Sequence, residues 1–405
     1  MEAAIRCQPP NGTRLAAHVE PYRTVRALHG PARSDLRRER ETCEAPVGGH
    51  PYNVRTAIRH GRADGVKIQA NELFAPVREG MHIEQKVVKH TPADKLYDAF
   101  ITLLAGAQGL VQINTLLRAD PATPADGYPT AIGRSCCAEQ SVVQETLDAC
   151  TPRAGGQLEA ALDTIYQRHS RGHHHDYQAQ HQVLDVDMSG IPCGLKAELA
   201  TKGYVATQRN RRGRQPGWVV ASRYDEVVVD WVFAGTTQLA AAARPLVRAA
   251  ERTLALEQDP ERRARAVLRV DAGGGSVADV NWALARGYRA HAKDYKDYSA
   301  SRARTLAASV TRWVDDPRVP GRQVGWVKQD PTAYVRPVRR VAVRCQKKNG
   351  QWGAAVLVSA LEPAAVLALT GQPPGAVDNP QAVLLVYVYF YDARSSAAET
   401  TFHGD

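Results

Sequence analysis

The sequence predicts an α/β fold with a mixed β-sheet, preceded by a helical domain and followed by a β-rich segment. In the middle of the chain, short apolar runs alternate with long stretches of helical periodicity, which is typical of a mixed sheet. Upstream of these runs, apolar residues recur at helical spacing. The 405 residues exceed the usual size of one domain, so we expect two or three domains.

Residues 1–80 are predicted to be an irregular leader, and residues 81–175 to be a helical domain. Glycines, prolines and a run of mixed charges punctuate the leader. In the second segment Thr91 and Pro92 mark a helix start, because threonine caps helices and proline suits the first helical position. We expect further helices at 109–117, from Ser141 onward, and around 158–165.

The first part of the sheet is expected in residues 181–295. A turn rich in arginine, residues 209–214, separates its second and third strands. The predicted strands are 183–187, 204–209, 218–222, 226–233, 266–271 and 288–293, and the predicted helices are 239–256 and 277–286.

Residues 296–380 are predicted to form a β-rich insertion. Strands at 338–344 and 352–359 flank an Asn-Gly dipeptide, which favours a hairpin turn. Residues 381–405 open with the apolar run 382–390, interpreted as a return strand, and continue into the start of a helix that carries a glutamate.

Carboxylates occur at the ends of apolar, strand-like runs. A carboxylate that ends a buried strand is costly unless a cation compensates it. Mg²⁺ or Mn²⁺ takes hard oxygen ligands, and two such ions can activate an attacking oxygen and stabilise a leaving one. We therefore predict a two-ion site whose catalytic and metal-binding residues are Asp187, Asp271 and Glu399. Asp185 is an alternative first acid, and Asp392 is an outside candidate for the third.

The order of these residues resembles the DDE transposases of bacterial insertion sequences, in the branch with a Tyr-x-x-Arg-…-Glu motif. The matching residues are Asp187-Met188-Ser189, Asp271 before its glycines, Tyr391, Arg394 and Glu399, within a resemblance that covers about residues 81–405. The resemblance implies an RNase H-like core with a β-rich insertion before the glutamate helix. It also implies an Mg²⁺- or Mn²⁺-dependent enzyme that cleaves DNA at terminal inverted repeats and transfers the freed strand.

The implied partner is double-stranded DNA, as inverted repeats and as target. The resemblance assigns end binding and dimerisation to residues 81–175, so we expect a homodimer on DNA. The expected location is cytoplasmic and nucleoid-associated, because the N-terminus lacks a secretory signal and the longest apolar run is too short to span a bilayer.

Two departures from the family pattern lead to alternatives. Four residues separate Arg394 from Glu399 where the family has three, which rotates the glutamate by about 100° on a helix. The family's lysine seven positions after the glutamate would fall beyond Asp405, so we expect a C-terminally truncated chain. The alternatives are a catalytically inactive transposase remnant that only binds DNA, or an RNase H-like nuclease without strand transfer.

Basic residues indicate how DNA would be held. The net charge of +10 and the pI of about 9.3 fit a polyanionic partner. Trp313, Trp326 and Trp352 are candidates for stacking on a base, a role that the resemblance implies for the insertion. The predicted DNA-binding residues are Tyr391, Arg394, Arg211, Arg212, Arg340, Lys347 and Lys348.

Other motifs favour no further site. The seven cysteines show no CxxC spacing, so neither a disulfide framework nor a zinc site is expected. Three consecutive side chains, His173 to His175, do not converge easily on one ion and are interpreted as a polar linker. Gly273 to Gly275 lack both the GxGxxG spacing and the Walker lysine of nucleotide-binding loops.

Overall fold

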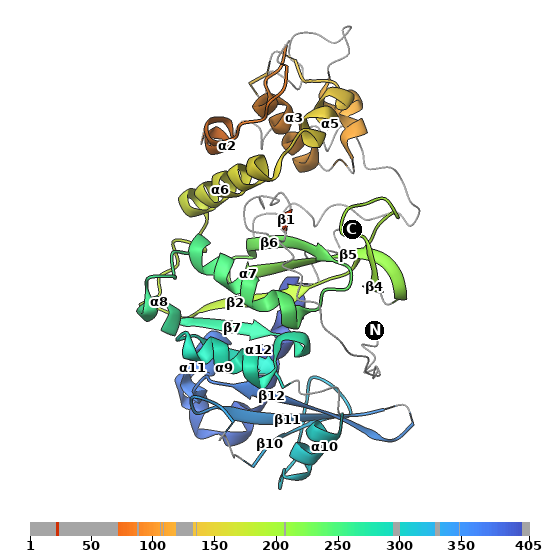
Figure 1. Cartoon of the computed structure of the whole chain (residues 1–405). Coiled ribbons are helices and arrows are strands. Elements are labelled where there is room, and N and C mark those ends of the chain that lie inside the picture. The colour runs from red at the N-terminus through yellow and green to blue at the C-terminus, as the bar shows by residue number, and fades with distance from the viewer. Residues whose placement is uncertain are drawn as a thin grey trace, which may run out of the picture. The chain divides into compact units, whose positions relative to one another are not determined.

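The computed structural model divides into two compact units, residues 25–170 and residues 1–24 with 171–405. Figure 1 shows the helices of the first unit and the sheet of the second. The structure describes residues 22–23, 72–86, 89–105, 107, 109–118, 133–134, 136–205, 208–294, 300–328, 333–347 and 349–398.

The first unit is helical, as the sequence predicts. Thr91 caps α3 through a capping box with Asp94. Apolar side chains from α2, α3 and α6 form one core. Its elements are α2 (Ala75–Gly80), α3 (Pro92–Leu104), η1 (Leu110–Gln112), η2 (Ile113–Leu117), α5 (Gln140–Asp148) and α6 (Pro152–His169).

Three details of this unit differ from the sequence expectations. Residues 75–80, expected to be irregular, form α2, which packs on α6. The segment 109–117 is a 3₁₀ turn followed by a π-helix instead of one α-helix. Helix α5 begins one residue before Ser141, with Glu139 at its N-cap, so Ser141 is not the cap.

The second unit is built on one mixed sheet with the order β1-β6-β5-β2-β7-β8-β12-β11-β10-β9. Strands β2, β7 and β8 are parallel, and β5 and β12 pair antiparallel with β2 and β8. The strands are β1 (Tyr22–Arg23), β2 (Gln182–Met188), β3 (Ile191–Pro192), β4 (Thr201–Val205), β5 (Gln208–Ala221), β6 (Glu226–Ala234), β7 (Ala266–Val270), β8 (Arg289–Lys293), β9 (Val314–Asp315), β10 (Arg322–Trp326), β11 (Arg339–Gln346) and β12 (Trp352–Ser359).

Helices cover both faces of this sheet. Helices α7 and α9 contact one face, and α12 contacts the other at β2, β10 and β11. Helix α10 packs on Ala342 and Val356, which alternate with the Val341 and Leu357 that face α12. The helices are α7 (Leu239–Thr253), α8 (Pro260–Ala264), η3 (Ala272–Gly274), α9 (Val277–Ala285), α10 (Ala300–Ala308), α11 (Pro363–Leu369), η4 (Pro374–Asp378) and α12 (Pro380–Ala398).

The interpretation of residues 382–390 as a return strand is wrong, because they form the first half of α12. This half is apolar on nearly every side, and a helix of that kind is buried between other elements. A continuous apolar run carries no period that separates a buried strand from a buried helix. The buried side chains are Val383, Leu384, Val386, Tyr387, Val388 and Phe390.

One correction and one further observation concern the strands. The arginine-rich segment 209–214 is not a turn, because it lies inside the long strand β5. Residues 296–380, predicted as a β-rich insertion, contribute strands to the same sheet, because β12 pairs with β8. This segment also contains α10, α11 and η4. None of the helices that the structure describes is long and apolar enough to cross a membrane.

Candidate active site

Two carboxylates lie side by side at one edge of the sheet. Strands β2 and β7 are parallel neighbours in which Val186 pairs with Val270. Asp187 on β2 and Asp271 directly after β7 are the next residues, and both follow runs of buried residues. Because the carboxyl ends of parallel strands meet at the same edge, residues 84 positions apart in the sequence become neighbours.

Helix α12 brings two polar side chains to these acids. The hydroxyl of Tyr391 donates a hydrogen bond to Oδ1 of Asp271 over 2.6 Å. Nη1 of Arg394 lies 2.7 Å from Oδ2 of Asp187, and Nη2 lies 3.6 Å from Oδ1 of Asp271. One guanidinium therefore bridges both carboxylates, and three elements converge on one point.

The charges at this point depend on each other. Burial raises the pKa of Asp187 above its ordinary value, against the opposing effect of Arg394, and the nearby Asp271 adds to the rise. Burial by itself lowers the pKa of Arg394, but the charges of Asp187 and Asp271 outweigh it and raise the pKa, so the guanidinium stays charged. Burial, reinforced by Asp271, raises the pKa of Tyr391, so its phenol remains a hydrogen-bond donor. The two acids need a cation between them.

The donor set fits a hard divalent cation. Asp187 and Asp271 both face the Arg394 guanidinium, and they are the residues that would hold such an ion. Mg²⁺ commonly takes only one or two carboxylates and completes its shell with water and phosphate. The side chains of Asp187 and Asp271 are 22% and 42% exposed, so solvent reaches both. Within the described residues, no group of three or more His, Cys, Asp or Glu side chains is placed to hold a metal.

The third predicted acid, Glu399, lies outside the described residues, one position beyond the end of α12. The outside candidate for that role, Asp392, turns away from the other two acids. Its carboxylate lies 2.7 Å from Nη2 of Arg322 on β10. Arg322 also pairs with Asp316, which accepts a hydrogen bond from the hydroxyl of Tyr389. Asp392 thus helps to fasten α12 to the far strands of the sheet.

Asp185, the alternative first acid, occupies a different environment from Asp187. It is fully buried, and Nε and Nη2 of Arg269 donate to its two oxygens over 2.6 Å each. The hydroxyl of Ser222 donates to the same carboxylate over 2.6 Å. The geometry therefore favours Asp187 as the acid available to a ligand.

Sequence reasoning missed the role of Arg269. It sits two residues before Asp271 in an otherwise apolar strand, as Asp185 sits two residues before Asp187. Side chains two apart on a strand share a face, so opposite charges at these positions of neighbouring strands were the signal. The sequence alone did not show that β2 and β7 are neighbours in this register.

Two basic hairpins extend past the edge where the acids lie. On β5, Trp218 pairs with Asp187 and Gly217 with Met188, so Gln208–Pro216 runs beyond the end of β2. This part of β5 carries Arg211, which is exposed, and Arg212, which is half-buried and donates to the carbonyl of Ala200. In Figure 1 the β4–β5 and β11–β12 hairpins project in the same direction as the arrowhead of β7.

The β11–β12 hairpin also runs past this edge of the sheet, on the other side of the acids. Leu357 of β12 pairs with Lys293 at the end of β8, so Trp352–Val356 runs beyond that end. Lys347, close to the tip, is exposed, whereas Lys348 lies outside the described residues. Both hairpins thus place basic residues on the acid side of the sheet.

Arg340, predicted as a DNA contact, takes an inward position. Its side chain is buried at 5% exposure and donates to the carbonyl of Lys328. Alternate residues of a strand point to opposite faces, and Arg340 takes the inward position while Arg339 takes the exposed one. An arginine enclosed by protein cannot reach a phosphate without unpacking the sheet.

The three tryptophan candidates differ in their packing and in their exposure to solvent. Trp326 packs in the core under α12, with its ring 5.6 Å from that of Tyr387. Trp313 and Trp352 lie on either side of Arg344, whose guanidinium carbon is 4.0 Å and 4.4 Å from their ring centres. Trp352 is 40% exposed, so it is the most accessible of the three to a stacking partner.

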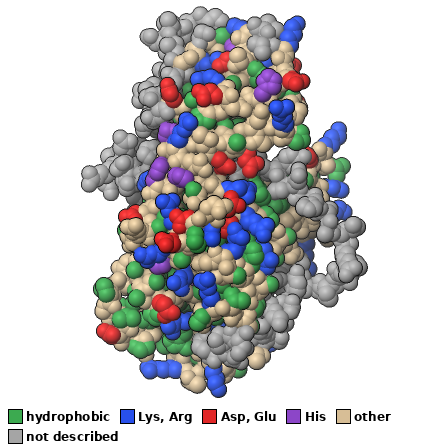
Figure 2. Space-filling model, turned by 60° about the vertical axis from the view of Figure 1, so that its left-hand side comes forward, with side chains coloured by type: hydrophobic (Ala, Val, Ile, Leu, Met, Phe, Trp, Pro, Cys, Tyr) green, Lys and Arg blue, Asp and Glu red, His purple; other side chains and the backbone are tan. Residues whose placement is uncertain are grey.

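Some cations elsewhere on this unit form ion pairs with acids. Around Trp282 on α9, Arg244 binds Asp279 and Arg286 binds Glu251. Figure 2 shows blue and red side chains close to one another on the face that it draws. Such pairing is typical of a solvated charged face.

The remaining motifs have structural explanations. His173 contacts the carbonyl of Thr253, while His175 contacts the hydroxyl of Tyr224. The glycine run after Asp271 is required by packing, because a Cβ on Gly275 would lie 1.9 Å from the carbonyl oxygen of Lys293.

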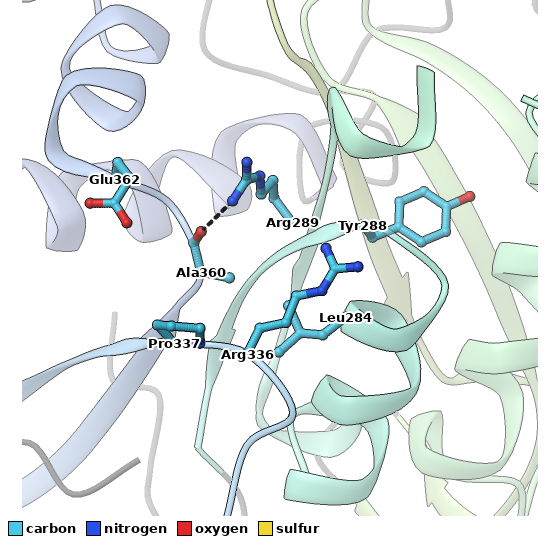
Figure 3. Close-up of a pocket in the computed structure, with 7 residues that line it drawn as sticks. All are labelled: Leu284, Tyr288, Arg289, Arg336, Pro337, Ala360 and Glu362. Carbon is cyan, nitrogen blue, oxygen red and sulfur yellow. Dashed lines mark hydrogen bonds between the residues drawn. The ribbon is translucent and has the colours of Figure 1, made fainter. Parts of the chain in front are cut away.

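Figure 3 shows a pocket of about 260 Å³ that neither acid lines. It includes Arg289 at the start of β8, whereas the acids lie at the opposite ends of the parallel strands. Arg289 donates to the carbonyl of Ala360, Glu362 pairs with Arg339, and Tyr288 directs its hydroxyl away from the other side chains drawn. The pocket does not contribute to the acid site.

Comparisons with known proteins add little to this geometry. The sequence matches no protein-family profile, and no curated protein matches it. Among solved structures, the chain is similar to piggyBac transposase, seen by cryo-EM in a synaptic complex with hairpin DNA. The two share 12% sequence identity with a TM-score of 0.37, over 87% of this chain and 67% of that chain. A likeness with this TM-score carries no argument about activity.

Proposed function

We propose that this chain is a DDE-type transposase that cleaves DNA at terminal inverted repeats and joins the freed 3′ hydroxyl to target DNA. The observation that carries the proposal is the convergence of Asp187 and Asp271 on Arg394, which lies 207 residues from Asp187 in the sequence. Two acids that share one cation at an open edge of the sheet are suited to hold a divalent metal. The homodimer and the end-binding role of the helical unit enter from the sequence resemblance alone.

Each residue has a distinct role in this proposal. Asp187, Asp271 and Glu399 hold the metal ions, which when bound would activate the attacking oxygen and stabilise the leaving one. Tyr391 orients Asp271 through its hydrogen bond. Arg394 balances the charge of the two acids, and its planar guanidinium suits a bidentate contact with a DNA phosphate.

The arrangement of strands supports an RNase H-like core. Strands β2, β5 and β6 form an antiparallel meander, and β7 and β8 follow in parallel on the other side of β2. An antiparallel set of strands followed by alternating helices and strands agrees with the order that the sequence predicts. The acids lie on β2 and directly after β7, the two central strands.

The two basic hairpins support a path for DNA across the acid edge. The β4–β5 hairpin flanks the edge beside β2, and the β11–β12 hairpin flanks it beside β8. Arg211 and Lys347 are exposed on them, and phosphate contacts of this kind supply affinity without reading sequence. Trp352 is the candidate to stack on a base next to this path.

The experiment measures nicking of a supercoiled plasmid that carries the DNA segments flanking the gene, in Mg²⁺ or Mn²⁺. The wild-type chain is compared with Asp187→Asn, Asp271→Asn and Glu399→Gln. Asp315→Asn is the matched control, because this aspartate is exposed on β9. We expect nicking by the wild type and the control alone, and unchanged DNA affinity in all variants.

Each contrary result identifies a different function. Equal nicking by the wild type and Asp187→Asn would show that the acids do not carry the reaction. Salt-sensitive DNA binding without nicking by any chain would favour the inactive remnant. Nicking without transfer of a 3′ hydroxyl to a second DNA would favour the RNase H-like nuclease.

A further inference from the structure

We propose that Arg269, held by Asp185, is a positioning residue that fixes α12 at the two acids. The Arg269 guanidinium contacts two other elements of the fold. Nε and Nη2 donate to Asp185 on β2, and Nη1 donates to the backbone carbonyl of Phe390 on α12 over 2.5 Å. One planar group therefore joins β2, β7 and α12, and its carbon also lies 4.8 Å from the centre of the Phe390 ring.

The place of this contact on α12 gives it a consequence for the acid site. Phe390 directly precedes Tyr391, which binds Asp271, and it lies one helical turn before Arg394, which binds both acids. A helix held at the Phe390 carbonyl has little freedom to rotate or slide at the next turn. Arg269 thereby sets where both side chains meet the acids.

Strands β2 and β7 contact α12 in two layers. The inner layer is the Asp185–Arg269 pair, and the outer layer is Asp187 and Asp271. Asp185 and Arg269 lie two residues before Asp187 and Asp271, so each pair shares the face that α12 covers. The inner layer is closed, with Asp185 at 0% and Arg269 at 4% exposure. The outer layer is open to solvent. A rigid inner layer beneath an adaptable outer one is how supporting residues hold a metal site in shape.

A buried ion pair by itself is weak evidence for a role in stability, because desolvation offsets most of its Coulomb energy. Its value is geometric, since arginine offers a fixed fork of donors that lysine cannot reproduce. Arg269→Lys therefore keeps the charge and loses the simultaneous grip on Asp185 and Phe390. We expect α12 to loosen at that turn while the sheet stays folded.

The first arm of the test measures hydrogen–deuterium exchange of the purified full chain without metal or DNA. In Arg269→Lys the amides of residues 391–394 should exchange at least about tenfold faster, whereas those of β2 and β7 should not change. The matched control is Arg286→Lys, because Arg286 grips Glu251 in the same two-pronged manner on the other face of the sheet. Unchanged exchange at 391–394 in Arg269→Lys overturns the proposal.

The second arm measures the affinity of Mn²⁺ alone by electron paramagnetic resonance, and it rests on the proposed function. Supporting groups around metal ligands commonly change affinity by about 10–100-fold, so we expect a loss of that size in Arg269→Lys and none in Arg286→Lys. If Mn²⁺ binds through Asp187 and Arg269→Lys leaves the affinity unchanged, the proposal fails. If the wild type and Asp187→Asn bind Mn²⁺ equally, the proposed function fails, and the exchange arm still decides on Arg269.

A double variant separates positioning from stability. Replacing the pair by apolar residues of similar size, Asp185→Leu with Arg269→Met, should keep or raise the unfolding midpoint. It should still leave residues 391–394 exchanging fast, because no donor reaches the carbonyl of Phe390. Wild-type protection at 391–394 in this double variant would mean that the pair serves folding alone.

Discussion

The two faces of strands β2, β7 and β8 differ in polarity, although both are formed by alternate residues of the same strands. The face under α7 and α9 is apolar at Leu184, Val186, Leu268, Val270, Ala290 and Ala292, and its one buried polar residue on β2 is Gln182 at the start of that strand. The face under α12 starts apolar with Val183 and Val267 and then becomes charged through the Asp185–Arg269 pair to the two acids. Polarity on that face increases toward the edge where the acids lie.

The two faces place different requirements on the residues that form them. The apolar face needs only volume and shape, because α7 and α9 supply no partner for a charge there. The charged face needs an exact partner for every group, and α12 supplies a carbonyl, a phenol and a guanidinium. A slip of β2 by one residue would exchange the two sets, so the register is specified by both faces together.

The largest effect is expected from a carboxylate placed on the apolar face. Leu184 is 1% exposed, so Leu184→Asp buries an acid without a partner. We expect a loss of more than about 4 kcal/mol in the free energy of unfolding, measured by urea denaturation. Leu184→Met, which conserves volume, should cost less than about 1.5 kcal/mol. A near-native midpoint for Leu184→Asp would contradict the division between the faces.

A smaller loss in the free energy of unfolding is expected when the charged face loses the cation Arg394. Arg394→Gln leaves Asp187 and Asp271 facing each other, which should cost about 1.5–3 kcal/mol at pH 7. Arg394 holds down the pKa of Asp187, so without it this pKa rises further. A group with a raised folded pKa destabilises less as the pH falls, so the variant should approach the wild type near pH 5. A pH-independent difference in urea denaturation would contradict the charge coupling.

The sequence predicted the central strands well because their apolar runs are short and bounded by polar residues. The predicted strand 183–187 lies within β2, and the predicted strand 266–271 covers β7 and one further residue. The placement of Asp187 and Asp271 at the ends of these runs made it reasonable to seek them together. It failed at 382–390, where burial on all sides removes the helical period. It also did not reveal that Arg340 is buried, because the inward or outward phase of a strand depends on a neighbour that the local sequence does not show. The catalytic roles of the acids stay predictions.

The charged face also contains a neutral histidine, which gives it a distinct pH response. His291 on β8 is fully buried among Tyr387, Phe390 and Tyr391, and burial together with Arg269 lowers its pKa to about 3. The unfolded chain takes up this proton near pH 6.5 and the folded chain does not, so stability falls as the pH drops from 6.5 toward 3.

His291→Phe should remove this part of the acid sensitivity. At pH 5 the histidine costs about 2 kcal/mol, from 1.5 pH units at 1.36 kcal/mol each. The difference in unfolding free energy between variant and wild type should therefore shift by that amount in favour of the variant between pH 7.5 and pH 5. The equivalent variant on a solvated site, His174→Phe, is the control. Parallel pH profiles for His291→Phe and the wild type would show that the buried ring does not resist protonation.

The smallest effect concerns arginines and lysines at the rim of the charged face, where inward and outward positions can be compared directly. Arg211 and Lys347 are exposed on the two hairpins, whereas Arg340 is enclosed by protein. A phosphate contact releases counterions, so losing one lowers the slope of log affinity against log salt by about 1. Arg211→Ala and Lys347→Ala should each do this in fluorescence anisotropy with a DNA duplex, at a cost below about 1 kcal/mol. Arg340→Met should leave the slope unchanged, because its guanidinium already donates inside the protein to Lys328. If Arg340→Met lowered the slope while Arg211→Ala did not, DNA would have to approach a different surface from the acid edge, and the path between the hairpins would be wrong.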